Sequence, residues 1–99
     1  MPIKTKPFDA AKYFVTDDDQ LELITDALDS GHAGYIAAAL GTVAKARGMT
    51  KVATDAGLNR QALYAALNEG GNPTLDTVVK VLDVLGLKLQ VRAKEPEMA

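Results

Sequence analysis

Cysteine and tryptophan are absent from the 99-residue sequence, and there is a single histidine. Without cysteine, neither a disulfide framework nor a thiolate metal site can form. Aromatic residues make up only 5% of the chain, whereas Ala, Leu and Val dominate the 47% that is apolar. This composition favours closely packed helices over a β-sandwich. We therefore expect one all-α domain over residues 1–99, without a cofactor, with a mobile stretch at residues 1–8 and a frayed tail at 93–99.

Long apolar runs are also missing, and none approaches the roughly 20 residues that span a bilayer. The first residues, Met-Pro-Ile-Lys-Thr-Lys-Pro, lack the apolar region of a secretion signal, so we expect a cytoplasmic protein with no membrane partner. Nor does the sequence suggest an enzyme. His32 has no partner nucleophile, and the carboxylates of Asp17, Asp18 and Asp19 point in different directions, as expected of a solvated helix start rather than a metal site.

The net charge of −2 is unevenly distributed along the chain. Residues 1–40 hold three Lys against seven Asp and Glu, a balance of −4, and residues 72–99 hold four charges of each sign. An excess of +2 in residues 41–71 comes from Lys45, Arg47, Lys51 and Arg60 against Asp55 and Glu69. Because binding to phosphate depends on local positive charge, the middle segment can bind nucleic acid although the whole chain is acidic.

Helices are predicted where apolar residues recur at helical spacing between a capping residue and a glycine. Thr16 and Thr74 are the expected N-caps, and Gly31, Gly48 and Gly86 the expected ends. The predicted helices cover residues 9–14, 17–30, 33–47, 50–56, 59–68 and 75–85. In the second and third of these, the residues expected to face inward are Leu21, Ile24, Leu28, Ile36, Ala39, Leu40 and Val43.

The C-terminal part of the chain holds two features that suggest a second copy. Leu87, Leu89 and Val91 alternate with polar residues and predict a short strand, whose open edge can pair across a two-fold axis or with the N-terminal segment. The last helix carries more apolar residues than one buried side requires, which leaves Val81 and Val84 as surplus. They are expected to pack beneath the strand or against a second copy, and we expect a homodimer.

Residues 49–68 satisfy the requirements of a helix-turn-helix, in which two short helices cross at about 90–120° through a short turn. Ala53 supplies the small residue where the helices touch, and Gly57 supplies the turn residue that tolerates a positive φ. Leu58 fills the corner, and Asn59 is the expected N-cap of the second helix. The inner faces consist of Val52, Ala56, Leu63, Ala66 and Leu67. A plain helix pair with a solvated polar face is the alternative explanation.

The outward face of the second helix carries side chains suited to DNA. From a helix in the major groove, Arg60 can pair with O6 and N7 of guanine, and Gln61 with N6 and N7 of adenine. Thr50 and Lys51 begin the first helix, where N–H groups and side chains can hold a phosphate. The candidate DNA-binding residues are Thr50, Lys51, Asn59, Arg60, Gln61, Tyr64, Asn68 and Asn72.

Five segments also carry a family-level pattern. They are Asp9-Ala-Ala-Lys-Tyr-Phe14, Ala39-Leu-Gly-Thr-Val-Ala-Lys-Ala-Arg-Gly-Met-Thr50, Ala56-Gly-Leu-Asn-Arg-Gln-Ala-Leu-Tyr64, Asn72-Pro-Thr-Leu-Asp-Thr77 and Lys80-Val-Leu-Asp-Val-Leu-Gly-Leu-Lys-Leu89. With these segments the chain resembles the HigA-like addiction-module antidote proteins, within the Xre/Cro-type helix-turn-helix repressors. The resemblance implies an antitoxin that binds a RelE/ParE-like toxin and represses its own operon as a dimer. It places the DNA-facing positions at Thr50, Lys51, Asn59, Arg60, Gln61 and Tyr64.

Together these patterns predict an all-α, lambda-repressor-like helix-turn-helix domain of five to six helices with a short C-terminal β-strand. We expect a dimer that binds a palindromic operator through the helix beginning at Asn59, and a cognate basic toxin that contacts the acidic residues 1–40. Two alternatives remain open. One is a solitary or phage-derived repressor without a toxin, and the other is a protein-interaction module that has lost DNA binding.

Overall fold

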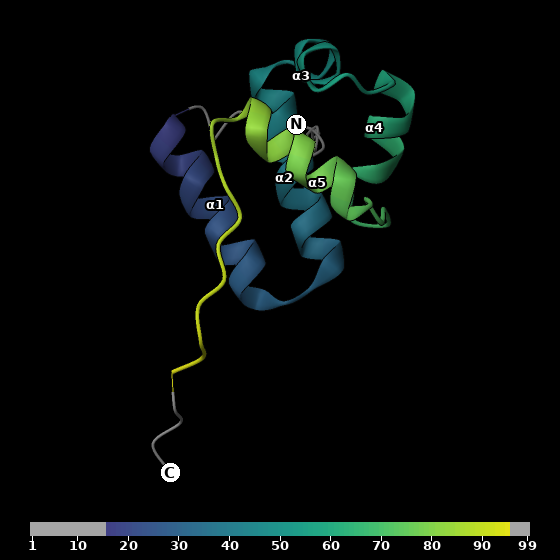
Figure 1. Ribbon diagram of the computed structural model, residues 1–99. Helices are drawn as coiled ribbons and strands as arrows, with labels where there is room; N and C mark the ends of the chain where they lie inside the picture. The colour runs from purple at the N-terminus through teal and green to yellow at the C-terminus, as the bar shows by residue number, and fades with distance from the viewer. Residues whose placement is uncertain (1–15, 96–99) are drawn as a thin grey trace, which may run out of the picture.

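The computed structural model describes residues 16–95 and contains five helices in that range. They are α1 (Asp17–Ser30), α2 (Ala33–Arg47), α3 (Met49–Ala56), α4 (Arg60–Ala66) and α5 (Leu75–Val84) (Figure 1). The all-helical class is thus confirmed for the described part of the chain. The predicted helix over residues 9–14 and the predicted mobile stretch at residues 1–8 lie outside the described residues. None of the described helices is long and apolar enough to cross a membrane.

Local chemistry fixes the ends of these helices as predicted. The hydroxyl of Thr16 accepts a hydrogen bond from the backbone N–H of Asp19 at 3.1 Å and so caps α1. Thr74 caps α5 in the same way, by accepting from the backbone N–H of Thr77 at 3.2 Å. Gly31 ends α1 with a φ of 69°, in the left-handed region that glycine adopts without strain. Most helix bounds therefore follow from residues that are close in sequence.

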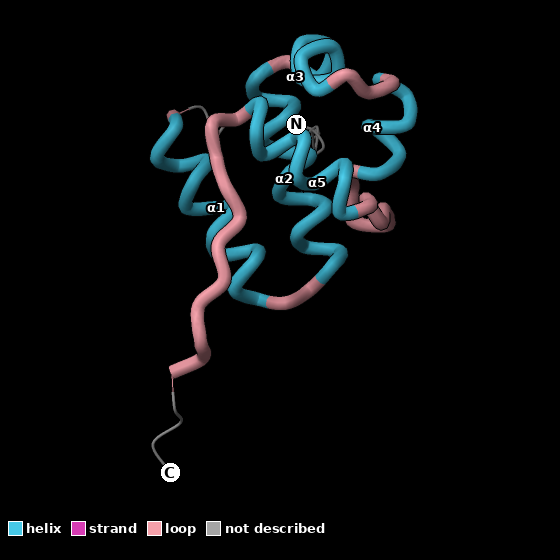
Figure 2. Tube along the Cα trace, viewed as in Figure 1, coloured by secondary structure: helices cyan, strands magenta, loops and turns pink. Residues whose placement is uncertain are grey.

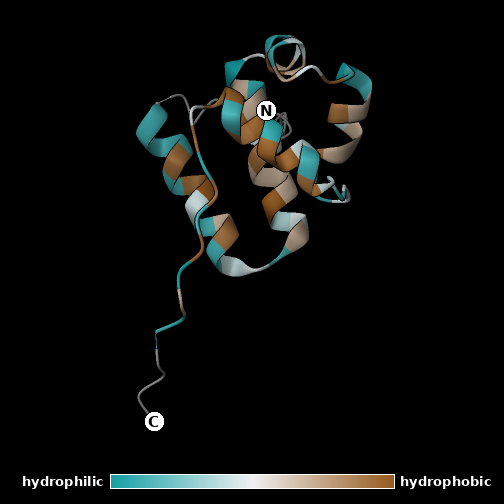
Figure 3. Ribbon diagram, viewed as in Figure 1, coloured by the Kyte–Doolittle hydropathy of each residue, from teal (hydrophilic) through white to brown (hydrophobic). Residues whose placement is uncertain are grey.

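Helix α2 lies at the centre of the bundle and packs against both α1 and α3. It is buried along most of its length, whereas α1 alternates between bands of opposite hydropathy (Figure 3). Around α2 the buried apolar residues form one core, with members from every helix: Ile24, Leu40, Val43, Ala44, Met49, Val52, Ala53, Leu63, Leu67, Val81, Leu82 and Leu85. Through these residues α3 and α4 both pack against the common core.

Two glycines let backbones approach closely beneath α4. A Cβ atom at Gly41, in α2, would overlap the backbone carbonyl of Leu67, which follows α4. A Cβ atom at Gly71 would overlap the carbonyl of Ala66, the last residue of α4. The backbone at the C-terminal end of α4 therefore contacts the backbone of two glycines, Gly41 and Gly71. The contact with Gly41 determines how closely this end of α4 approaches α2.

The predicted C-terminal strand is not formed, and the described residues contain no strand (Figure 2). Residues 88–92 instead run alongside α1, where Arg92 lies 3.9 Å from the carboxylate of Asp29 (Figure 1). A strand needs a neighbour to pair with its backbone N–H and C=O groups, and the side chains of α1 cannot supply a ladder. Leu89 and Val91 remain 40% and 99% exposed, respectively.

The burial of apolar residues also differs from prediction. Val81 is fully buried in the core rather than surplus, and Val84 is partly buried against it. The exposed apolar residues of α5 are instead Leu75 and Val79. In α1, Ile24 faces inward as expected, but Leu21 and Leu28 are 47% and 37% exposed. A wide apolar stripe on a helix does not say which of its edges the neighbours cover, and this is why both predictions failed.

Candidate nucleic-acid interface

A three-residue connection, Gly57, Leu58 and Asn59, joins α3 to α4. Gly57 has a φ of 68° and ends α3, with its N–H donating to the carbonyl of Thr54 at 3.1 Å. The N–H of Leu58 then donates to the carbonyl of Ala53 at 2.8 Å. These two bonds close the last turn of α3 in the manner of a Schellman motif, which requires a left-handed residue at its centre. The turn predicted at Gly57 is confirmed.

Helix α4 begins at a side-chain cap and buries one side. The amide oxygen of Asn59 accepts a hydrogen bond from the backbone N–H of Ala62 at 3.1 Å. Leu63 and Leu67 are 1% and 2% exposed and anchor the helix to the core, as predicted. The opposite side, which includes Arg60 and Gln61, is exposed to solvent. The sequence therefore turns the polar residues of α4 outward by burying the two leucines.

Tyr64 lies one turn after Arg60 on α4 and is 43% exposed. The guanidinium carbon of Arg60 lies 5.5 Å from the centroid of its ring, and the amine nitrogen of Lys45 lies 5.7 Å from the same centroid. Both distances are within the range of a cation–π interaction, worth about 0.5–1 kcal/mol at an exposed site. Two cations from different helices thus lie against the ring of Tyr64.

These residues line an open hollow of about 680 Å³ between the end of α2, the start of α3 and α4. Its lining consists of Lys45, Gly48, Met49, Thr50, Lys51, Arg60 and Tyr64. Three of these residues are cationic and none is acidic. We refer to the exposed members of this lining that carry a side chain, namely Lys45, Thr50, Lys51, Arg60 and Tyr64, as the basic face. Such a surface offers positive charge and hydrogen-bond donors to a polyanion.

Lys45 belongs to the basic face although the sequence did not point to it as a site residue. It lies in the last turn of α2, outside residues 49–68, and only the packing of α2 against α3 and α4 brings it beside Tyr64. The available signal was its position one turn before the glycine that ends α2, a place where cations are favoured by the helix dipole. That signal concerns the helix end and carries no information about α4.

Arg47, in contrast, is directed toward α1. Its Nη2 lies 2.9 Å from the carboxylate of Asp17, and its Nε donates to the amide oxygen of Gln20 at 2.8 Å. Of the four cations in residues 41–71, Arg47 is thus the one held by carboxylate and amide groups of α1, while the other three line the hollow. The local positive charge expected from the sequence is therefore gathered on the basic face, but one cation fewer contributes to it.

The remaining predicted residues are placed differently. Gln61 and Asn72 are exposed, on α4 and in the following loop. The side chain of Asn68 is engaged within its own turn: its Nδ2 donates to the carbonyls of Tyr64 and Ala65 at 3.1 and 2.9 Å, and its Oδ1 accepts from the N–H of Gly70 at 2.9 Å. These bonds cap the C-terminal end of α4 and explain why the helix ends at Ala66, before the predicted Asn68.

The sequence matches the family described as "Probable addiction module antidote protein" over residues 4–93. An uncharacterized protein of Haemophilus influenzae is 38% identical over 92 residues, which cover 93% of this chain and 95% of that protein. No solved structure matches the chain. The family-level resemblance is thus confirmed in its broader form, while the HigA-like and Xre/Cro-type assignment stays a prediction. With a match over nearly its whole length, the chain belongs to the family of probable addiction module antidote proteins.

Proposed function

We propose that this antidote protein is the antitoxin of a type II toxin–antitoxin module, which binds its toxin directly and represses its own operon by binding DNA through α3 and α4. The antitoxin role follows from membership of the family. DNA binding is our own proposal, and it is supported by one observation above all. Lys45, Lys51 and Arg60 gather around Tyr64 on a face without carboxylates, in a chain whose net charge is −2.

In this proposal α3 and α4 act as a helix-turn-helix of the lambda-repressor type, with α4 in the major groove. Arg60 and Gln61 stand at the start of α4, exposed, where they contact base edges. Thr50 and Lys51, in the first turn of α3, contact a phosphate together with Lys45. Asn59 and Asn68 act by capping the two ends of α4, and Asn72 contacts the backbone from the loop.

We further propose that the protein binds its operator as a homodimer. A single small domain contacts one half-site, whereas two copies related by a two-fold axis contact a palindrome. Leu89 and Val91 support this, because they are 40% and 99% exposed and form apolar surface that a second copy can cover. The toxin in this proposal is a small basic protein of the RelE/ParE-like type.

A gel-shift titration with the DNA upstream of the protein's own gene tests DNA binding. We expect a specific shift for the wild type and a loss of about 1–3 kcal/mol in binding free energy for Arg60→Ala and for Gln61→Ala. Lys80→Ala is the matched control, because it removes one exposed cation from α5, away from the basic face. Its binding should equal that of the wild type in the same buffer.

Three outcomes would contradict the proposal, and two of them favour an alternative. The absence of any shift would indicate a protein-interaction module that does not bind DNA. An unchanged shift in both α4 variants would show that Arg60 and Gln61 do not contact DNA, which contradicts the proposed role of α4. A specific shift without binding to the protein encoded by the adjoining gene would instead favour a solitary repressor. The three possibilities therefore give three different combinations of results.

A further inference from the structure

The first helix carries charge of one sign only. Within Asp17–Ser30 there are six acidic residues and no Lys or Arg. Asp17 pairs with Arg47, and Asp29 lies 3.9 Å from Arg92. The other four carboxylates line one side of the helix. They are Asp18, Asp19, Glu22 and Asp26, and all four are exposed. This is more negative charge than the stabilisation of one helix start requires, because the dipole acts only within the first turn.

Helix α1 also exposes apolar surface next to these carboxylates. Helix α1 buries Gln20, Ile24 and Ala27 against the bundle, which leaves Leu21 47% exposed and Leu28 37% exposed. Leu21 and Thr25 lie between two open hollows, one on the side of the carboxylates and one on the side of residues 88–92. Exposed leucines that are rimmed by polar groups are typical of a protein contact surface.

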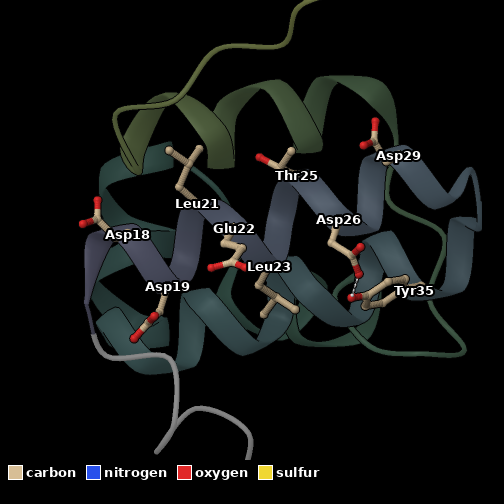
Figure 4. Close-up of a pocket in the computed structure, with 9 residues that line it drawn as sticks. All are labelled: Asp18, Asp19, Leu21, Glu22, Leu23, Thr25, Asp26, Asp29 and Tyr35. Carbon is tan, nitrogen blue, oxygen red and sulfur yellow. Dashed lines mark hydrogen bonds between the residues drawn. The ribbon is translucent and has the colours of Figure 1, made fainter. Parts of the chain in front are cut away.

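Figure 4 shows the first of these hollows, of about 730 Å³, with Leu21 projecting from the helix, Asp18 and Glu22 nearest to it, and Asp26 further along the helix next to Tyr35. At one end the hydroxyl of Tyr35 donates a hydrogen bond to Asp26 Oδ2 at 2.6 Å. This bond ties the carboxylate to α2, and it raises the pKa of the Tyr35 hydroxyl above its ordinary value, with desolvation and the charge of Asp26 acting in the same direction. One carboxylate of the group is thus held in place. We refer to Asp18, Leu21, Glu22, Thr25 and Asp26 as the acidic face.

We propose that the acidic face of α1 is the surface on which the toxin docks. Leu21 would enter an apolar recess of the toxin, and Lys or Arg side chains around that recess would meet Asp18, Glu22 and Asp26. This inference rests on the proposed antitoxin function and adds the surface and the chemistry of the partner. Charge complementarity favours a basic protein as the partner. Nucleic acid is negatively charged like the acidic face and would be repelled by it. A two-fold contact between two copies would place one acidic face against another.

The experiment measures binding of the full-length chain to the protein encoded by the adjoining gene. Leu21→Lys removes the apolar contact and places a cation against a basic partner, and its affinity should fall about 30-fold or more, as expected for a central contact residue. Leu75→Lys is the matched control, because it makes the same replacement at a leucine of α5 that is 71% exposed and lines neither hollow. Its affinity should stay at the wild-type value.

A second variant separates the charge from the leucine. Asp18→Asn with Glu22→Gln should mainly slow association and flatten its dependence on salt, because charges around a contact steer the encounter. Circular dichroism and binding to the upstream DNA show that each variant is folded, since all three substituted positions lie outside the basic face.

Each result has one meaning. If wild-type protein does not bind the adjoining gene product, the proposed toxin partnership fails. If the wild type binds and Leu21→Lys binds equally well, the docking surface is wrong and the antitoxin function stands. If Leu21→Lys instead changes the oligomeric state in sedimentation while binding is retained, the acidic face contacts a second copy, and the inference is overturned.

Discussion

The basic face and the acidic face differ in every property that decides what a surface binds. The first presents three cations around a tyrosine, and the second presents carboxylates around a leucine. They belong to different helices, yet both rest on α2, which packs against α1 on one side and α3 on another. The net charge of −2 indicates neither surface, because it sums the charges of both. One bundle of helices thus carries two surfaces of opposite charge.

Arg47 joins the two regions. It extends from the last turn of α2, next to the start of α3, and bonds to Asp17 and Gln20 of α1. Without this contact the positive charge of residues 41–71 would extend toward α1. By neutralising Arg47, α1 keeps the basic face compact and separates it from the carboxylates that follow along the same helix.

The largest effect is expected when the charge of the basic face is reversed. Lys45→Glu combined with Lys51→Glu sets two carboxylates against the DNA backbone, and juxtaposed like charges cost several kcal/mol, so operator affinity should fall about 100-fold or more. Fluorescence anisotropy of a labelled upstream duplex measures this. The same variant should bind the adjoining gene product as the wild type does, and a parallel loss of both activities would show that the faces are not separate.

A second prediction concerns the close contact between Gly41 of α2 and the backbone that follows α4. Gly41→Ala places a Cβ atom against the backbone carbonyl of Leu67, and overpacking of this kind destabilises by about 1–3 kcal/mol. Urea denaturation measures the change in the free energy of unfolding. Gly70→Ala is the matched control, because its Cβ would meet only the side chain of Asn68 at an ordinary 3.5 Å. Equal stability of the two variants would contradict the close packing of α4 on α2.

The role of Asn68 sharpens the description of the basic face. If its side chain caps α4, Asn68→Ala should lower stability by about 1 kcal/mol, as expected for the loss of exposed hydrogen bonds at a helix end. DNA affinity should fall less than in Arg60→Ala. Asn72→Ala, in the exposed loop, should leave stability within about 0.5 kcal/mol of the wild type. A large loss of DNA affinity without a loss of stability in Asn68→Ala would show that Asn68 contacts bases.

The smallest effect is expected at the ion pair between Arg47 and Asp17, which lies between the basic face and the acidic face. Asp17 is 91% exposed, so the free energy of its ion pair with Arg47 is largely screened by solvent. Asp17→Asn should change the free energy of unfolding by less than about 1 kcal/mol in thermal or urea denaturation. A larger loss would mean that the contact between α1 and α2 depends on this pair rather than on the burial of Ile24 and Ala27.

Much of the fold could be predicted because the responsible interactions are local. The threonine caps, the glycine ends and the turn at Gly57 each depend on residues a few positions apart, and all were confirmed. The burial of Leu63 and Leu67 also followed from their spacing. What failed depends on tertiary packing. The exposure of Leu21 and the burial of Val81 are decided by which edge of a helix its neighbours cover.

The candidate site divides in the same way. Arg60 and Tyr64 share one side of α4 and were predictable from their spacing of four residues. Lys45 was missed, because only the packing of both α2 and α4 against α3 brings it to the tyrosine ring. The predicted strand failed because alternation describes a segment's two sides but cannot supply the neighbour with which a strand pairs.

We propose that the basic face binds DNA and that the acidic face takes no part in this binding. The most direct measurement is an anisotropy titration of one labelled upstream duplex with wild-type protein, Arg60→Ala and Leu21→Lys. We expect Arg60→Ala to bind more weakly by about 1–3 kcal/mol and Leu21→Lys to bind as the wild type does. Equal affinity of wild type and Arg60→Ala, or no preference of the wild type for this duplex over a scrambled one, would contradict the account.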